Sequence, residues 1–219
     1  MKLFDFRKLN QGGAAVLALL YGLFLTLDIL GIRPEVSVAA KYAGICICFL
    51  MACARLFVTG FSRDGQLVAL ALGLTLAADT FLLWTEVFVW GVVVFCGVQA
   101  VYARRFGAHW GFAALGITLF AALALLGTLP LLFAVVAVYA CLFVGNMVAV
   151  FCSEQCLSPR MVRRSRVGMV LFFLCDINVM LYNLLPPQET YLPGILMWLF
   201  YLPGQYFLST SADGDGERV

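Results

Sequence analysis

Two aspartates interrupt long apolar stretches of this sequence, and each is the only acid in its stretch. Asp79 lies in the apolar run of residues 67–83, and Asp176 lies in the run that begins near residue 167. A carboxylate in hydrocarbon is costly unless it is protonated or paired, so acids in such places are rare and usually functional. Two carboxyl groups can perform acid–base chemistry when one stays protonated and donates a proton while the other is ionised and activates water.

Other polar side chains fall within apolar runs and could surround these acids. At about 1.5 Å per helical residue, Asp79 and Asp176 both lie roughly 15–20 Å from the cytoplasmic side, and this matched depth predicts one shared polar cavity. The supporting candidates are Lys41, Gln99, Tyr139, Asn183, Tyr201 and Gln205. Two structural interpretations remain open. The acids could be hydrogen-bonding groups that join helices, and Lys41 could be the ion-pair partner of Asp28 or of one of the two acids.

Several other chemistries are excluded by residue counts. His109 is the single histidine, so one chain cannot build a three-histidine zinc site. No Gly-x-Ser-x-Gly nucleophile motif occurs. The eight cysteines fall mostly in apolar runs and are interpreted as small buried hydrophobic residues. We therefore expect no metal and no cofactor.

The elements that must position the two acids are membrane helices. The chain is 63% hydrophobic and 12% charged, whereas soluble domains carry about 25% charged residues. Eight apolar runs are long enough to span a bilayer. They cover residues 13–31, 37–58, 67–85, 87–106, 110–127, 129–152, 167–185 and 191–210. The predicted fold is all-α: a polytopic bundle of eight transmembrane helices in a single domain, residues 1–210.

The distribution of basic residues sets the orientation. If the N-terminus is cytoplasmic, 12 of the 14 Lys and Arg residues lie inside, Arg33 lies outside and Lys41 lies in the membrane. This split follows the positive-inside rule and supports an even number of spans, with both termini cytoplasmic. Residues 211–219 are polar and are predicted to be a short disordered cytoplasmic tail.

The order of several short motifs resembles that of the YhhN-type lysoplasmalogenase family, over essentially the whole chain. The matching positions are Lys41, Ala78-Asp79-Thr80-Phe81-Leu82, Gly91, Phe95, Tyr102, Tyr139, Gly168, Phe172, Cys175-Asp176 and Tyr201-Leu202-Pro203-Gly204-Gln205. Two positions depart from the family pattern, which usually has Gly where this chain has Ala78 and His where it has Gln99. These departures bear on activity and substrate choice more than on fold.

The resemblance implies hydrolysis of the vinyl-ether bond of lysoplasmalogens, with Asp79 and Asp176 as catalytic residues and Tyr102 added to the supporting set. The products would be a fatty aldehyde and a glycerophospho-alcohol. The expected partner is a single-chain ether phospholipid, with no nucleic acid, and the expected location is a membrane, the cell membrane in a bacterium. Two alternatives remain: a transporter or lipid-binding protein whose acids relay protons or bind a headgroup, and a non-catalytic family member.

Overall fold

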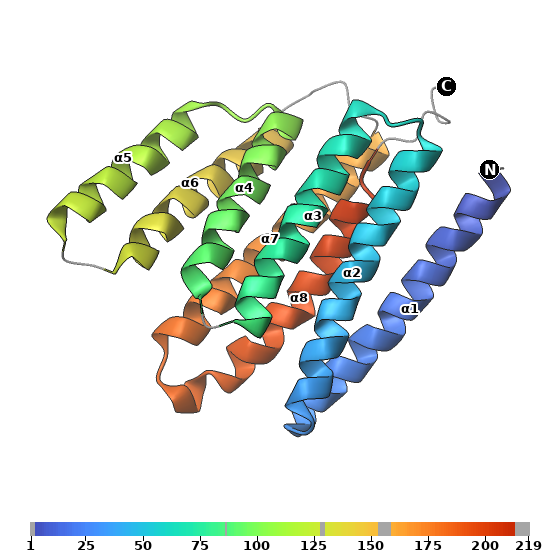
Figure 1. Ribbon diagram of the computed structural model, residues 1–219, viewed down its shortest axis with the longest axis horizontal. Coiled ribbons are helices and arrows are strands. Elements are labelled where there is room, and N and C mark those ends of the chain that lie inside the picture. Colours follow the sequence, from blue (N-terminus) through green and yellow to red (C-terminus); the bar gives the residue numbers. More distant parts are fainter. Residues whose placement is uncertain (1–2, 86, 128–129, 153–158, 213–219) are drawn as a thin grey trace. The chain divides into compact units, whose positions relative to one another are not determined.

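The computed structural model describes residues 3–85, 87–127, 130–152 and 159–212, and these residues are helical almost throughout (Figure 1). They contain eight α-helices, one short 3-10 helix and no strand. In chain order the elements are α1 (Leu3–Leu30), α2 (Pro34–Val58), α3 (Arg63–Trp84), α4 (Phe88–Phe106), α5 (Gly111–Leu126), α6 (Leu131–Cys152), α7 (Pro159–Leu184), η1 (Pro187–Glu189) and α8 (Tyr191–Ser209). Each predicted apolar run corresponds to one α-helix, so the all-α polytopic fold is confirmed.

Most of these helices have the length and composition of membrane spans. Within the described part of the chain, five are long and apolar enough to cross a bilayer: residues 10–30 of α1, and all of α2, α3, α6 and α7. The other three, α4, α5 and α8, have 19, 16 and 19 residues. Large apolar side chains are widely exposed, as Leu19 (74%) and Leu125 (87%) illustrate. Such a surface suits lipid rather than water. The eight-span count and the orientation stay predictions.

Two helices extend well beyond the apolar runs that predicted them. Helix α1 begins at Leu3 and α7 begins at Pro159, ahead of predicted starts at residues 13 and 167. The additional N-terminal turns of α7 carry Arg160, Arg163, Arg164 and Arg166. Arginine is a good helix former, so the backbone stays helical where the composition no longer suits hydrocarbon. Apolar runs therefore marked the membrane-buried part of each helix rather than its ends.

The turn between α1 and α2 shows how the local sequence ends one helix and starts the next. Gly31 adopts a left-handed conformation (φ 64°), and Ile32 N donates to Leu27 O at 3.1 Å, which closes α1. Arg33 is also left-handed (φ 50°), which is unusual for a residue with a side chain. Pro34 then occupies the first position of α2, where its missing N–H is not needed.

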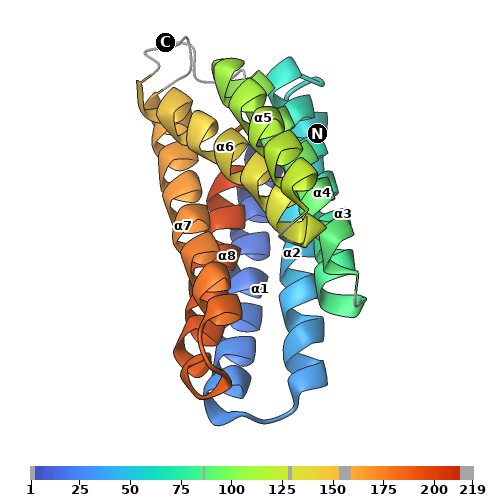
Figure 2. The same cartoon turned by 90° about the vertical axis from the view of Figure 1, so that its left-hand side faces the viewer.

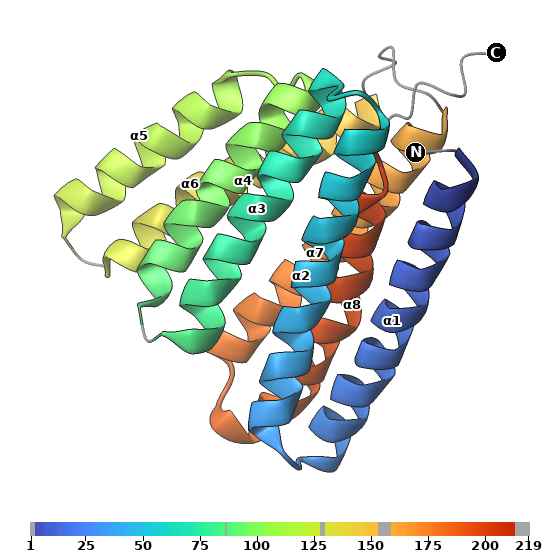
Figure 3. The ribbon, with the colours of Figure 1, turned by 45° about the vertical axis from the view of Figure 1, so that its right-hand side comes forward.

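The helices form two compact units, each described separately here. The first unit comprises residues 1–65 and 158–219 and contains α1, α2, α7 and α8. Figure 2 shows α7 and α8 side by side and joined through η1, and Figure 3 shows α1 beside α2. The second unit, residues 66–157, contains most of α3 together with α4, α5 and α6. The single domain expected for residues 1–210 stays a prediction.

Small residues allow neighbouring helices to approach closely, as is common in membranes. A Cβ atom on Gly168 of α7 would lie 2.7 Å from Leu208 Cγ and 3.2 Å from Gly204 O on α8. In the second unit, a Cβ on Gly91 of α4 would lie 3.3 Å from Ala78 O on α3. Both positions favour glycine because a Cβ atom would press on a carbonyl oxygen of the neighbouring helix, and Gly91 places α4 against the turn of α3 that precedes Asp79.

A proline inside α8 creates a bond between helices. Pro203 lacks an N–H, so the carbonyl of Leu199, four residues earlier, loses its usual helical donor. The hydroxyl of Tyr21 on α1 donates to Leu199 O at 2.9 Å. A backbone carbonyl without a donor is costly within a membrane, so this bond restores what the proline removed and joins α1 to α8.

The residues that directly follow α8, at the C-terminal end of the first unit, are buried. Ser211 and Ala212 are almost completely buried, although the sequence predicted a disordered tail from residue 211. Arg55 Nε donates to Ala212 O at 2.7 Å, and an Arg164 guanidinium nitrogen donates to Thr210 O at 3.0 Å. These arginines bind the carbonyl groups that follow α8. The remainder of the predicted tail, residues 213–219, lies outside the described residues.

Candidate functional site

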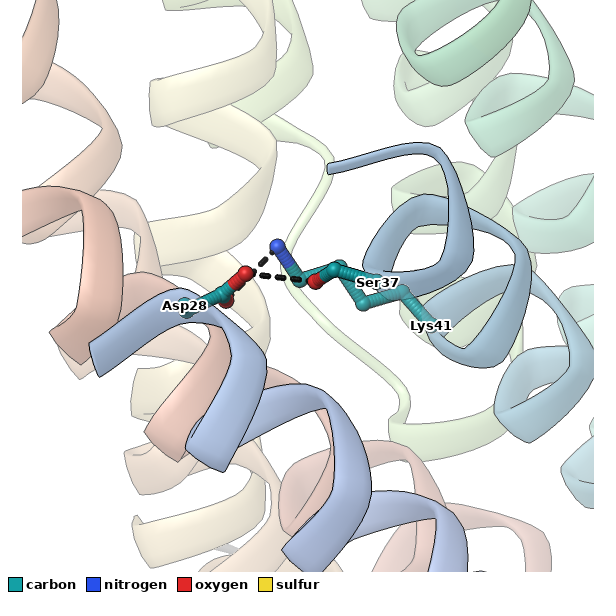
Figure 4. Close-up of polar contacts among 3 residues, drawn as sticks. All are labelled: Asp28, Ser37 and Lys41. Atoms are coloured by element: carbon teal, nitrogen blue, oxygen red, sulfur yellow. Dashed lines mark hydrogen bonds and ion pairs between the residues drawn. The ribbon is translucent and has the colours of Figure 1, made fainter. Parts of the chain in front are cut away.

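Lys41 on α2 is buried and forms an ion pair with Asp28 on α1. Its ammonium nitrogen lies 2.8 Å from Asp28 Oδ2, which makes the contact a close ion pair. Ser37, one turn before Lys41, donates from its hydroxyl to Asp28 Oδ1 at 2.5 Å. Figure 4 shows both contacts meeting at the Asp28 carboxylate. Of the partners that the sequence left open for Lys41, the structure selects Asp28.

Aromatic rings surround the same ammonium group. Lys41 Nζ lies 4.9 Å from the centre of the Trp198 ring and 5.9 Å from that of Phe24. Trp198 packs edge-on against Tyr201 at 5.3 Å, and Tyr201 packs edge-on against Phe172 at 5.7 Å. The ring faces attract a cation and exclude water from it. Lys41 is thus fully engaged by one carboxylate and two rings, and Tyr201 lies next to this cluster.

Gln205 lies one helical turn after Tyr201 on α8, as the sequence predicted. Its side chain is fully buried, and neither Nε2 nor Oε1 has a hydrogen-bond partner among the described residues. Buried amides are normally paired with protein or with water. An unpaired buried amide beside an aromatic cluster is able to bind a polar ligand group.

Asp176, the candidate catalytic acid in the first unit, is half-buried on α7. Asn183, predicted on the same face, is exposed, and its Nδ2 donates to Val179 O of its own helix at 2.7 Å. Asn178 bonds similarly to Leu174 O at 2.7 Å but is buried. Seven residues place Asn183 about two turns beyond Asp176, where α7 no longer packs deeply. The structure therefore does not bring Asn183 into a site with Asp176.

Asp79, the candidate catalytic acid in the second unit, is almost completely buried, with 3% of its surface exposed. It follows Ala78, which packs against Gly91 of α4. Thr75, one turn earlier on α3, is fully buried, and its hydroxyl oxygen has no hydrogen-bond partner among the described residues. Asp79 is therefore enclosed by neighbouring side chains, and its catalytic role stays a prediction.

Gln99 on α4 is fully buried and hydrogen-bonded to Asn146 on α6. Asn146 Nδ2 donates to the backbone oxygen of Gln99 at 2.8 Å and to its side-chain Oε1 at 2.9 Å. The two tyrosines of the predicted site that lie in the second unit make ring contacts. Tyr102 stacks on Phe106 at 5.6 Å, and Tyr139 packs against Phe95 at 6.2 Å.

Each unit thus gathers part of the predicted site. The first unit joins Lys41 and Tyr201 through Trp198, and it also contains Gln205 and Asp176. The second contains Asp79, Gln99, Tyr102 and Tyr139. The cavity predicted to be shared by Asp79 and Asp176 would need both units, and it stays a prediction.

The structure pairs the predicted site residues with partners that the sequence did not assign to them. Asn146 pairs with Gln99, although 47 residues separate them, and no sequence pattern links the two. Phe24 and Trp198 carry no charge or motif that distinguishes them from other aromatic residues of the apolar runs. Thr75 had one usable signal, because it lies one turn from Asp79 on the same helix.

Thiol and metal chemistry has no assembled site in the described part of the chain. Its seven cysteines, which exclude Cys156, carry thiols rather than disulfides. No group of three or more His, Cys, Asp or Glu residues is placed to hold a metal ion there.

Comparison with known proteins supplies one match. No curated protein and no solved structure was matched by this chain. The profile of the YhhN family matches residues 36–212, which include Lys41, Asp79, Gln99, Asp176 and Gln205. That range covers most of the 219 residues. The chain is therefore a member of the YhhN family.

Proposed function

We propose that this protein is a membrane-embedded hydrolase that cleaves the vinyl-ether bond of lysoplasmalogens. The observation that carries the proposal is a buried acid, Asp79, in an apolar helix of a chain that belongs to the YhhN family. The resemblance of its motifs to lysoplasmalogenases names the substrate. A single-chain ether phospholipid can reach an intramembrane carboxyl group from the bilayer itself.

In the proposed reaction a protonated aspartate transfers its proton to the outer alkene carbon of the vinyl ether. The resulting oxocarbenium ion is stabilised by the other, ionised aspartate, which also directs water to the cationic carbon. Water adds to the cationic carbon to form a hemiacetal, and the proton that it loses passes through the ionised aspartate back to the aspartate that acted as the acid. Collapse of the hemiacetal then breaks the carbon–oxygen bond and releases a fatty aldehyde and a glycerophospho-alcohol. One water is consumed, and both carboxyl groups regain their starting states. No metal or redox cofactor takes part.

The test is aldehyde release by the purified full chain in lipid vesicles. An alkenyl lysophospholipid should yield aldehyde, whereas matched single-chain lipids with an acyl or an alkyl ether linkage should not. The alkyl ether has no double bond to protonate, so it tests the requirement for the alkene, whereas the acyl ester reports general lipase activity and contaminating esterases. Absence of aldehyde from the alkenyl lipid, with the helical fold intact by circular dichroism, would reject the proposal.

A further inference from the structure

The Gln99–Asn146 pair leaves two buried polar atoms unused. Both side chains have no exposed surface, and both lie in the second unit. Gln99 Nε2 and Asn146 Oδ1 have no hydrogen-bond partner among the described residues. One of these atoms is a donor and the other is an acceptor.

Their identities follow from the backbone. The Gln99 main-chain oxygen can only accept, so the Asn146 atom 2.8 Å away must be its NH₂ group. That same NH₂ group lies 2.9 Å from the end of the Gln99 side chain, which must therefore present Oε1. The opposite arrangement would place two donors together. Nε2 and Oδ1 consequently flank the bond between the two amides, as one unpaired donor and one unpaired acceptor.

A hydroxyl group can satisfy both atoms, as a water molecule also can. Its oxygen accepts from Gln99 Nε2, while its hydrogen is donated to Asn146 Oδ1. A phosphate or carboxylate anion has no hydrogen for Oδ1, and an ammonium group has no acceptor for Nε2. An esterified or otherwise capped oxygen could accept but could not donate. We propose that Gln99 and Asn146 bind the free glycerol hydroxyl of the single-chain lipid, an inference that rests on the proposed function.

The position of the pair along α3 and α4 suits this role. The two helices are joined at residues 85–87 and run antiparallel, and a Cβ on Gly97 would lie 3.7 Å from Leu74. Because Gly91 lies against Ala78 and the helices are antiparallel, Gln99 lies at about the level of Ala71 on α3. That level is roughly 12 Å from Asp79 along the α3 axis.

Side-chain direction shortens that distance. Helical side chains lean toward the N-terminus of their own helix, so in this antiparallel pair Gln99 and Asp79 lean toward each other's level. In the substrate, a few bonds separate the glycerol hydroxyl from the alkene carbon to be protonated. A hydroxyl held by Gln99 and Asn146 would therefore keep the vinyl ether near the level of Asp79.

The test compares two lipids that cannot be hydrolysed: a single-chain alkyl ether phospholipid and its analogue with hydrogen in place of the hydroxyl. The purified wild-type chain should bind the hydroxyl form at least about tenfold more tightly, since a buried donor and a buried acceptor lose their partner in the analogue. Gln99→Met and Asn146→Leu should each remove most of this preference by weakening the hydroxyl form alone. Ser165→Ala, which removes another fully buried unpaired hydroxyl, on α7, is the matched control and should keep the preference.

Aldehyde release from the alkenyl lipid, measured in parallel, separates the two proposals. Equal wild-type binding of both alkyl lipids, with aldehyde still released, overturns the hydroxyl subsite and leaves the reaction standing. A preference that depends on Gln99 and Asn146, without aldehyde release, supports the subsite and rejects the reaction. If Asn146→Leu fails to fold, the wild-type comparison and Gln99→Met decide the question.

Discussion

A polar network in the first unit and an amide pair in the second differ in how completely their buried polar groups are paired. In the first, Ser37 and Lys41 both contact the Asp28 carboxylate, and elsewhere in that unit the Tyr21 hydroxyl donates to the Leu199 carbonyl that Pro203 leaves without a helical donor. In the second, the Gln99–Asn146 pair keeps an unpaired donor and an unpaired acceptor. Satisfied polar groups join helices, whereas unsatisfied ones favour a ligand or water. The difference indicates that polar residues in membrane helices divide into groups that stabilise the fold and groups available for binding.

The two intramembrane acids are predicted to serve catalysis, unlike Asp28. Asp79→Asn and Asp176→Asn should each lower aldehyde release by about 10²–10⁴-fold, because the amide has neither the acidic proton nor the charge. Thermal unfolding should change little, since asparagine keeps the size and most hydrogen bonds. Aldehyde release and unfolding temperature should be measured on the same preparations. Near-normal turnover in either variant would return that acid to the structural group.

The Asp28–Lys41 ion pair should show the reverse behaviour. Asp28→Asn and Lys41→Met should each lower the free energy of unfolding by about 3 kcal/mol, because one buried charge loses its partner. The double variant should recover much of that loss. Thermal unfolding in detergent, analysed as a double-mutant cycle, measures the coupling. Strictly additive losses would show that Asp28 and Lys41 do not stabilise each other.

The helices could be predicted because the thickness of a bilayer requires about 20 apolar residues per span, and runs of that length can be counted in the sequence. The partner of Lys41 could not, since choosing Asp28 rather than Asp79 or Asp176 requires the rotation and depth of several helices at once. The Gln99–Asn146 pair is similar, because it joins α4 and α6 across 47 residues. The position of Pro203 in the sequence implies that the Leu199 carbonyl lacks its helical N–H donor. Nothing in the sequence indicates that the Tyr21 hydroxyl replaces that donor. Patterns along a single helix could be recognised in the sequence, whereas contacts between helices could not be predicted from it.

The close approach of α7 and α8 provides a test that does not involve polar groups. Gly168→Ala should lower the free energy of unfolding by about 1–3 kcal/mol, because the added methyl overlaps Leu208 and reaches Gly204 O. Gly22→Ala on α1 is the matched control. Nothing lies within 4 Å of a Cβ at Gly22, and alanine is the better helix former. Its unfolding temperature should be unchanged or higher. Equal effects at both positions would reject close packing as the reason for glycine at 168.

The smallest expected effect concerns the bonds that tyrosines make to backbone carbonyls. Tyr21→Phe should lower the free energy of unfolding by about 1 kcal/mol, because Leu199 O then lacks both its helical donor and the phenol. Tyr191→Phe removes a similar 2.8 Å bond, to Ile29 O, but at an exposed site where water can replace it. Its effect should be smaller than that of Tyr21→Phe. Restoring the helical donor with Pro203→Ala should make Tyr21→Phe nearly neutral, measured again by thermal unfolding. If Tyr21→Phe costs the same in the Pro203→Ala background, the hydroxyl stabilises α1 and α8 independently of the donor that Pro203 removes, and the compensation inferred here is wrong.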